Sequence, residues 1–291
     1  MLTRRIFQRR FFLRPTPDVV AIFNYCLAEA ALRFNIRPIA WCAMSNHYHA
    51  VVHDPDGKLP AFTEHFHKMT SKTLNALYGR WENLWSSEET CVTRLVTPED
   101  VFDKVCYVLA NPVAAHLVER VDDWPGSSSW QLMGTTESLT VERPKYYFRK
   151  EKSRMPATAT LRAVAPDGLD EAAYKHWVTL VREEVARREQ KAKALRIAEK
   201  IKLVGRQRVL EVAPDDCPET AAPRRNLRPA LACKDDVRME AEKILLKEFR
   251  HAYYKARVAF AAGERTVVFP AGTYRLLRSW DVCCTPFPNT A

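Results

Sequence analysis

Two histidines separated by one residue, His47 and His49, are the first candidates for chemistry in this sequence of 291 residues. The alternation over 47–53 predicts a strand, and residues two apart on a strand point to the same face. Two imidazoles placed side by side in this way can chelate one divalent metal. The pair alone also fits two partly buried polar side chains, or a structural zinc site. A histidine-triad hydrolase is disfavoured, because Val51 stands where its third alternating histidine would be.

Tyr107 and Asn111 form the second candidate group. They are four residues apart in a predicted helix and therefore share one of its faces. A tyrosine hydroxyl that faces a metal-bound phosphate can act as a nucleophile, and an amide oxygen beside imidazoles gives a mixed site suited to Mg²⁺ or Mn²⁺. The alternative is a core tyrosine and an asparagine that ends the helix before Pro112.

Hydrophobic periodicity predicts the elements that must position these groups. Capping signals at Thr16-Pro17-Asp18 and Thr97-Pro98-Glu99-Asp100 mark two helix starts. The order β-α-β-β-α-β-α predicts an α+β fold of the split βαβ or ferredoxin-like type, with an antiparallel sheet and helices on one face. Strands are predicted over 5–13, 36–44, 47–53 and 90–96, and helices over 19–34, 60–78 and 101–118, the last interrupted at 111–112.

Composition shifts divide the remainder of the chain. The turn-rich segment 124–130 closes a first domain over 1–130. A basic and mostly helical extension follows over 131–213, in which 157–169 reads as a linker. Four prolines predict a linker over 214–234, and 235–291 is predicted to hold a helix to residue 262 and a β-hairpin over 263–280.

Charge suggests a polyanionic partner. The chain has 45 basic and 35 acidic residues, a net charge of +10, and most of the excess falls in 151–291. The alternative is a basic protein without such a partner. The eight glycines form neither phosphate-binding loop motif, and no apolar run reaches the length of a membrane span. We therefore expect a cytoplasmic protein with no membrane partner.

Four motifs in order resemble the REP-associated branch of the single-tyrosine HUH transposases. The resemblance covers about residues 3–130 and departs from the family at Ser86-Ser87-Glu88-Glu89, where many relatives carry Gln then Arg, and at His116, where small residues are common. The motifs are Met-Ser-Asn-His-Tyr-His-Ala-Val-Val at 44–52, Trp-Glu-Asn-Leu-Trp at 81–85, Tyr-Val-Leu-Ala-Asn-Pro-Val-Ala-Ala at 107–115 and Trp-Pro-Gly-Ser-Ser at 124–128.

The resemblance implies a metal-dependent transesterification of single-stranded DNA near hairpins. It makes His47, His49 and Asn111 the ligands of Mg²⁺ or Mn²⁺, and Tyr107 the nucleophile that forms a 5′-phosphotyrosine link. No second tyrosine follows four residues later, which disfavours the two-tyrosine branch. The alternative is a protein that binds DNA hairpins without strand transfer. A monomer or homodimer associated with the nucleoid is expected in either case.

Two groups of basic residues are candidate DNA contacts. One surrounds the first predicted strand, where phenylalanines 7, 11 and 12 either stack on bases or belong to the core. The other lies on a helix predicted over 182–208. The alternative is that this helix only presents a charged face to solvent. His65 and His67 are interpreted as surface residues. The candidate DNA contacts are Arg4, Arg5, Arg9, Arg10, Arg14, Arg187, Arg188 and Lys191.

Overall fold

The computed structural model describes residues 1–148, 151, 153–220, 229–273 and 275–286. The chain divides into two compact units, Met1–Ala230 and Leu231–Ala291, which are described separately below. The sequence predicted boundaries after residues 130, 213 and 234. No helix in the described part of the chain is long and apolar enough to cross a membrane.

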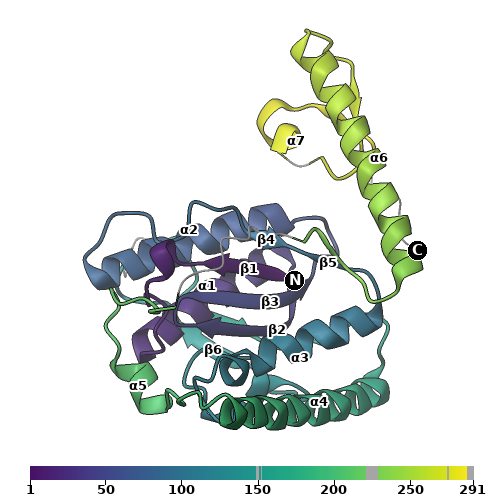
Figure 1. Ribbon diagram of the computed structural model, residues 1–291. Coiled ribbons are helices and arrows are strands. Elements are labelled where there is room, and N and C mark those ends of the chain that lie inside the picture. Colours follow the sequence, from purple (N-terminus) through teal and green to yellow (C-terminus); the bar gives the residue numbers. More distant parts are fainter. Residues whose placement is uncertain (149–150, 152, 221–228, 274, 287–291) are drawn as a thin grey trace. The chain divides into compact units, whose positions relative to one another are not determined.

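A four-stranded antiparallel sheet organises the first unit (Figure 1). The strand order is β2-β3-β1-β4, and each neighbouring pair is antiparallel. β1 and β2 consequently run in the same direction with β3 between them. This confirms the predicted α+β class and antiparallel sheet. The strands are β1 (Leu2–Arg5), β2 (Arg37–Met44), β3 (His47–His53) and β4 (Cys91–Val92).

Helices cover both faces of this sheet. On one face, Tyr48 of β3 packs with its ring centroid 5.6 Å from that of Phe23 in α1 (Pro17–Phe34). It also lies 5.4 Å from Phe66 in α2 (Leu59–Tyr78). The other face is covered by α3 (Pro98–Ala114) and α4 (Glu171–Ala198), as Figure 1 shows. The prediction that all helices lie on one face is therefore wrong for α3.

The second face needs this cover because it is also apolar. Cys42 and Met44 of β2 and Val51 of β3 share a buried cluster with α3. α4 packs on the outer side of α3 through three valines at helical spacing, which removes further apolar surface from water. The apolar residues of the two helices in this cluster are Val105, Cys106, Val108, Leu109, Val113, Val178, Val181 and Val185.

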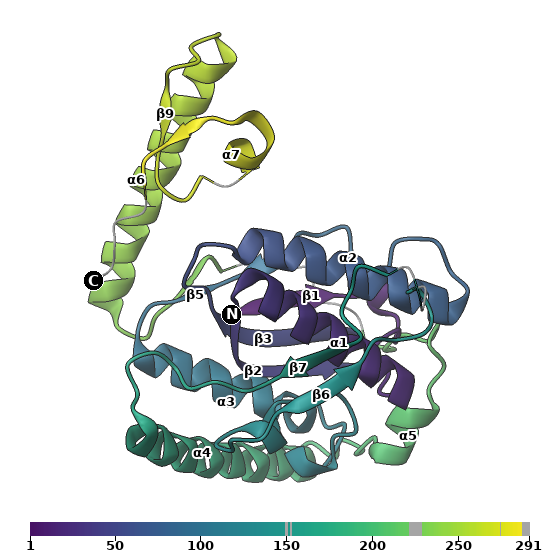
Figure 2. The same ribbon diagram turned by 180° about the vertical axis from the view of Figure 1, so that it is seen from behind.

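A further pair of strands packs against α1, as seen from behind in Figure 2. β6 (Leu139–Glu142) and β7 (Thr158–Leu161) pair antiparallel. The Tyr25 hydroxyl of α1 donates to the Pro156 carbonyl at 2.6 Å and fixes the chain just before β7. The linker predicted over 157–169 therefore contains a strand with two buried side chains, Ala159 and Leu161.

The starts of the helices agree with the predictions, whereas the ends of α3 and of β1 differ from them. Thr97 and Asp100 form the predicted capping box of α3. α3 then continues through Pro112 instead of stopping there, and Pro112 is buried. The first strand ends at Arg5, not at residue 13, because Gln8 and Arg9 have φ angles of 52° and 59°, which a strand cannot accommodate.

The turn-rich segment 124–130 lies against the edge strand β2. Trp124 donates from Nε1 to the Ala43 carbonyl at 3.2 Å, and the Ala43 amide donates to Ser127 at 2.8 Å. Gly126 is required between them, because a Cβ at this position would lie 2.4 Å from the Trp124 indole nitrogen. The segment thus covers the backbone of an edge strand.

The remaining elements are short, apart from one helix of the second unit. The described residues of 263–280 do not form the predicted hairpin: β9 and β10 are parallel, with α7 between them, and pack on α6. A parallel pair needs such a crossover. The first unit also contains β5 (Arg94–Leu95) and α5 (Arg206–Glu211), and the second contains β8 (Leu231–Ala232), α6 (Asp236–Ala261), β9 (Val268–Phe269), α7 (Arg275–Trp280) and β10 (Cys283–Cys284).

Candidate active site

His47 and His49 lie side by side on the face of β3 that α3 covers. Their ring centroids are 4.8 Å apart and the ring planes are nearly perpendicular, at 81°. Strand pairing places Arg5 opposite His47 and Thr3 opposite His49. These four side chains therefore form two adjacent cross-strand pairs on one face.

Each imidazole is oriented through its Nδ1 atom. His49 Nδ1 lies 2.7 Å from the Thr3 hydroxyl, and His47 Nδ1 lies 2.6 Å from the side-chain oxygen of Asn46. Because that oxygen is an acceptor, His47 Nδ1 carries the proton and Nε2 keeps its lone pair. A hydrogen bond at one ring nitrogen is the usual way in which proteins orient a histidine that ligates metal through the other.

Both imidazoles are held neutral. Burial lowers the pKa of His47 to about 4, and the charges of Arg5 and Arg9 act in the same direction. Burial, with smaller contributions from His47 and Arg5, holds the pKa of His49 well below its usual value. Neutral imidazole is the form that binds a metal, so the pair is ready to ligate at neutral pH without first losing protons.

Tyr107 of α3 reaches the histidines from the opposite side of the site. Its ring centroid lies 5.3 Å from that of His49, and 38% of the residue remains exposed. A substrate can therefore approach Tyr107 from solvent while the neighbouring histidine stays buried. Asn111 follows one turn later on the same face of α3 and is buried. The structure thus brings together His47, His49 and Tyr107.

The side chains of His47, His49 and Asn111 suit a divalent metal that keeps several coordination positions open to other ligands. Two neutral imidazoles face one side, and a buried amide from Asn111 lies on the helix that covers them. Among the described residues, no three histidine, cysteine or carboxylate side chains are grouped for metal binding. A closed four-ligand zinc site is therefore not formed by these residues, and water or phosphate oxygens would complete the coordination.

Two positive side chains lie near the histidine–tyrosine group. Arg5 is exposed on β1, and its charge acts on both histidines. Lys104 Nζ lies 5.9 Å from the centre of the Tyr107 ring and 3.0 Å from the Asp103 carboxylate. The Asp103 carboxylate offsets the charge of Lys104, so Arg5 is the exposed positive side chain beside the histidines, where an anionic phosphate would approach.

The other predicted DNA contacts near β1 already bind protein groups. Arg4 donates to the Thr90 hydroxyl at 2.9 Å and to the Ser86 carbonyl at 3.3 Å, within the unit. Arg9, Arg10 and Arg14 contact the segment after α5, as described below. Phe12 belongs to the core, whereas Phe7 and Phe11 are only partly buried.

The three candidates on α4 differ in their surroundings. Arg188 pairs with Asp103 of α3 at 2.9 Å and with Glu184 at 2.7 Å, so it joins the two helices. Arg187 also contacts Glu184 and is largely exposed. Lys191 is exposed. The basic helix is thus bound to α3 on one side and open to solvent on another.

The interpretation of His67 as a surface residue is wrong, whereas His65 is partly exposed, with 19% of its side chain accessible. His67 is 8% exposed and its Nε2 lies 2.6 Å from the Tyr48 hydroxyl. His65 lies 2.7 Å from the buried carboxylate of Glu29. Both side chains serve the contact between the sheet, α1 and α2. Thr3 and Asn46, conversely, were not predicted to orient the histidines.

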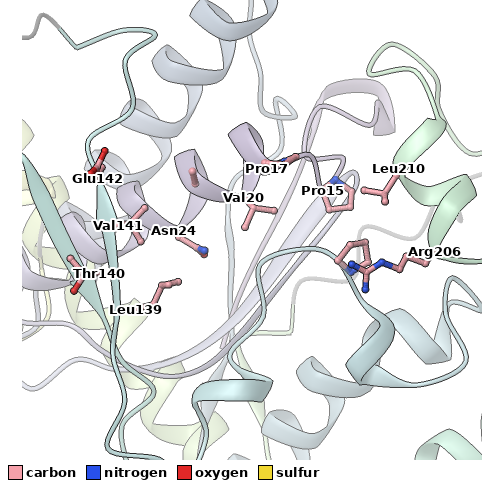
Figure 3. Close-up of a pocket in the computed structure, with 12 residues that line it drawn as sticks. Pro15, Pro17, Val20, Asn24, Leu139, Thr140, Val141, Glu142, Arg206 and Leu210 are labelled. Atoms are coloured by element: carbon pink, nitrogen blue, oxygen red, sulfur yellow. The ribbon is translucent and has the colours of Figure 1, made fainter.

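A cavity of about 510 Å³ lies away from the histidines, between α1, β6 and α5 (Figure 3). Its walls are mostly apolar, with Asn24 among the polar exceptions. None of the predicted site residues that the structure describes lines this cavity. The lining side chains are Pro15, Pro17, Val20, Ala21, Asn24, Pro125, Leu139, Thr140, Val141, Glu142, Arg206 and Leu210.

Comparison with known proteins yields one similarity. No protein-family model and no curated protein matches this chain. Among solved structures, the chain is similar to a REP-associated tyrosine transposase bound to a REP hairpin, with 19% sequence identity and a TM-score of 0.37. The match covers 45% of this chain and 74% of the other. A similarity of this extent carries no conclusion about shared activity.

Proposed function

We propose that this protein is a metal-dependent transesterase of single-stranded DNA with a ferredoxin-like catalytic unit. The observation that carries the proposal is the convergence of His47, His49 and Tyr107, with ring centroids 4.8 and 5.3 Å apart. The residues come from a strand and from a helix more than fifty positions later, so their meeting does not follow from sequence proximity.

His47, His49 and Asn111 would hold Mg²⁺ or Mn²⁺ in this proposal. When bound, the metal polarises a non-bridging phosphate oxygen and stabilises the charge that develops on it. Thr3 and Asn46 keep the histidine rings oriented, and the exposed Arg5 attracts the phosphodiester.

Tyr107 supplies the nucleophile. Its hydroxyl oxygen forms a bond to phosphorus while the bond from phosphorus to the 3′ oxygen breaks. The phenol proton passes to solvent and the departing oxygen takes up a proton, leaving a 5′-phosphotyrosine and a free 3′-hydroxyl. Attack by a 3′-hydroxyl in the reverse direction rejoins strands, and since each step exchanges one phosphoester for another, no nucleotide is consumed. Following the family resemblance, the DNA carries a hairpin beside the cleaved bond.

The test is a covalent adduct. The protein is incubated with Mn²⁺ and a pool of hairpin-bearing single-stranded oligonucleotides with randomised flanks, and the adduct is detected on denaturing gels. Y107F should abolish the adduct, whereas Y147F should retain it. Tyr147 is a matched control because it is 41% exposed, close to the exposure of Tyr107.

Two outcomes would oppose the proposal. An adduct that persists in Y107F would show that another residue is the nucleophile. Hairpin binding without any adduct, in either Mg²⁺ or Mn²⁺, would favour a DNA-hairpin-binding protein without strand transfer.

A further inference from the structure

An acidic segment of the chain lies against the arginines that follow β1. This segment, 212–220, is called the acidic strap below. Its sequence is Val-Ala-Pro-Asp-Asp-Cys-Pro-Glu-Thr, with three carboxylates and no basic residue. The sequence predicted a linker here, but the strap is bound along its length to side chains of the first unit.

Asp215 makes the charged contacts in the middle of the strap. Arg10 Nη1 donates to the Asp215 carbonyl at 2.6 Å and pairs with its carboxylate at 3.4 Å. Arg80, from the end of α2, pairs with the same carboxylate at 3.4 Å. The Asp215 side chain is 66% exposed, so these ion pairs are weak and easily exchanged.

Two more arginines bind the ends of the strap. Arg14 Nη1 donates to the Val212 carbonyl at 2.7 Å. Arg9 contacts both the carbonyl and the hydroxyl of Thr220. Four guanidinium groups thus donate to carbonyl, hydroxyl and carboxylate oxygens of a segment that turns at 213–216, where the Asp216 amide donates to the Ala213 carbonyl at 3.1 Å. A phosphodiester backbone presents the same kind of oxygen acceptor with greater charge.

The arginines border the candidate active site. The loop that bears Arg9 and Arg10 is bonded to the turn before His47: the Ile6 amide donates to the Asn46 carbonyl at 2.8 Å and the Leu13 amide donates to the Ser45 carbonyl at 2.9 Å, next to Arg14. A DNA strand held by these arginines would therefore continue toward the histidines.

We propose that Arg9, Arg10, Arg14 and Arg80 form a binding surface for the backbone of single-stranded DNA, and that the acidic strap occupies this surface until DNA displaces it. This inference rests on the proposed DNA-processing function and adds its regulation. The strap therefore lowers the affinity for DNA, because each phosphate that binds one of these arginines must replace a contact between that arginine and the strap.

Affinity for DNA tests the strap without requiring catalysis. Binding of a fluorescein-labelled 20-nucleotide single strand to the full chain is measured by anisotropy in EDTA at fixed salt. D215N removes both ion pairs and should tighten binding by about two- to fivefold. E219Q makes the same charge change in the strap at a residue without an ion pair among the described residues, and its effect should be smaller. Equal affinities for D215N and E219Q would overturn the inference.

R10A tests the surface itself. It should weaken binding and lower the slope of log affinity against log salt by about one. Binding as tight as that of the wild type would show that DNA does not use this surface.

Hydrogen exchange tests displacement directly. The Phe11 amide donates to the Asp216 carbonyl at 3.0 Å, so it reports on the attached strap. Saturating DNA should accelerate exchange at Phe11, and unchanged or slower exchange would overturn displacement. These readouts are independent of Tyr107: a failed adduct with faster exchange rejects only the transesterase, and an adduct without faster exchange rejects only the strap.

Discussion

Replacement of Thr3 by valine should weaken metal binding although Thr3 itself is not a proposed ligand. The change removes the hydroxyl that lies 2.7 Å from His49 Nδ1 and keeps the β-branched shape that suits β1. His49 is 6% exposed, so water does not readily replace the lost partner. A buried polar group left unpaired costs about 1–3 kcal/mol.

That cost lowers the stability of the fold and is separate from the loss of metal affinity. Removing a partner that orients a ligating histidine lowers metal affinity by about 10- to 100-fold. At about 1.4 kcal/mol for each factor of ten, that loss is about 1.4–2.8 kcal/mol. It is expected because the hydroxyl fixes the tautomer and orientation of one imidazole.

The measurement is Mn²⁺ affinity, obtained by counting free Mn²⁺ with electron paramagnetic resonance in the absence of DNA. The matched control is T3S, which keeps the hydroxyl and should bind within about threefold of the wild type. Affinity of T3V within twofold of the wild type would refute the reasoning, as would T3S binding as weakly as T3V. Urea unfolding of the metal-free variants separates a general loss of stability from the loss at the metal.

Two further predictions concern the contact between the sheet, α1 and α2. Y48F removes the hydroxyl that lies 2.6 Å from buried His67 and should lower the free energy of unfolding by about 1–3 kcal/mol in urea titrations; a change below about 0.5 kcal/mol would contradict the proposed hydrogen bond. Burial raises the pKa of Glu29, but hydrogen bonds from His65 and Arg33 outweigh it, so the pKa lies below its usual value. A carboxyl with a lowered folded pKa stabilises the fold above its unfolded pKa, and this stabilisation is lost as pH falls through the folded pKa. E29Q should therefore be less stable than the wild type at pH 7, with the difference shrinking below about pH 4; a difference independent of pH would oppose this account.

Short sequence patterns predicted the elements that depend only on residues close together in the chain. The antiparallel pair over 36–44 and 47–53 follows from apolar periodicity on either side of a two-residue turn, and the structure places β2 and β3 at nearly these residues. The starts of α1 and α3 follow from a threonine before proline, and both threonines cap in the structure. Such signals need no knowledge of the tertiary fold.

Elements that depend on tertiary contacts were missed. Pro112 should end a helix by its own chemistry, but α3 continues two residues beyond it to Ala114, and Pro112 is buried there. β7 has only four residues, too few for a clear period-2 signal, and it pairs with β6 and packs on α1. Likewise, nothing in the order of elements indicates that α3 covers the second face of the sheet.

The candidate site likewise combines features that local sequence patterns predicted with features that depend on tertiary contacts. The shared face of His47 and His49 follows from strand geometry, and the resemblance to a family linked them to Tyr107. The pairing of Thr3 with His49 depends on the register between β1 and β3, which a single sequence does not contain. Asn46 was visible as a turn residue, and its position next to His47 was the available signal for its second role.

The face on which the histidines lie is determined by the residue between them. Tyr48 is completely buried, contacts rings from both α1 and α2, and meets a partner for its hydroxyl in His67. A shift of β3 by one residue would expose Tyr48 on the α3 side and bury both histidines among phenylalanines. The loss of an aromatic burial worth about 1.5–3 kcal/mol opposes that shift. The core contact of Tyr48 on one side of the sheet therefore fixes His47 and His49 on the side where Tyr107 can meet them.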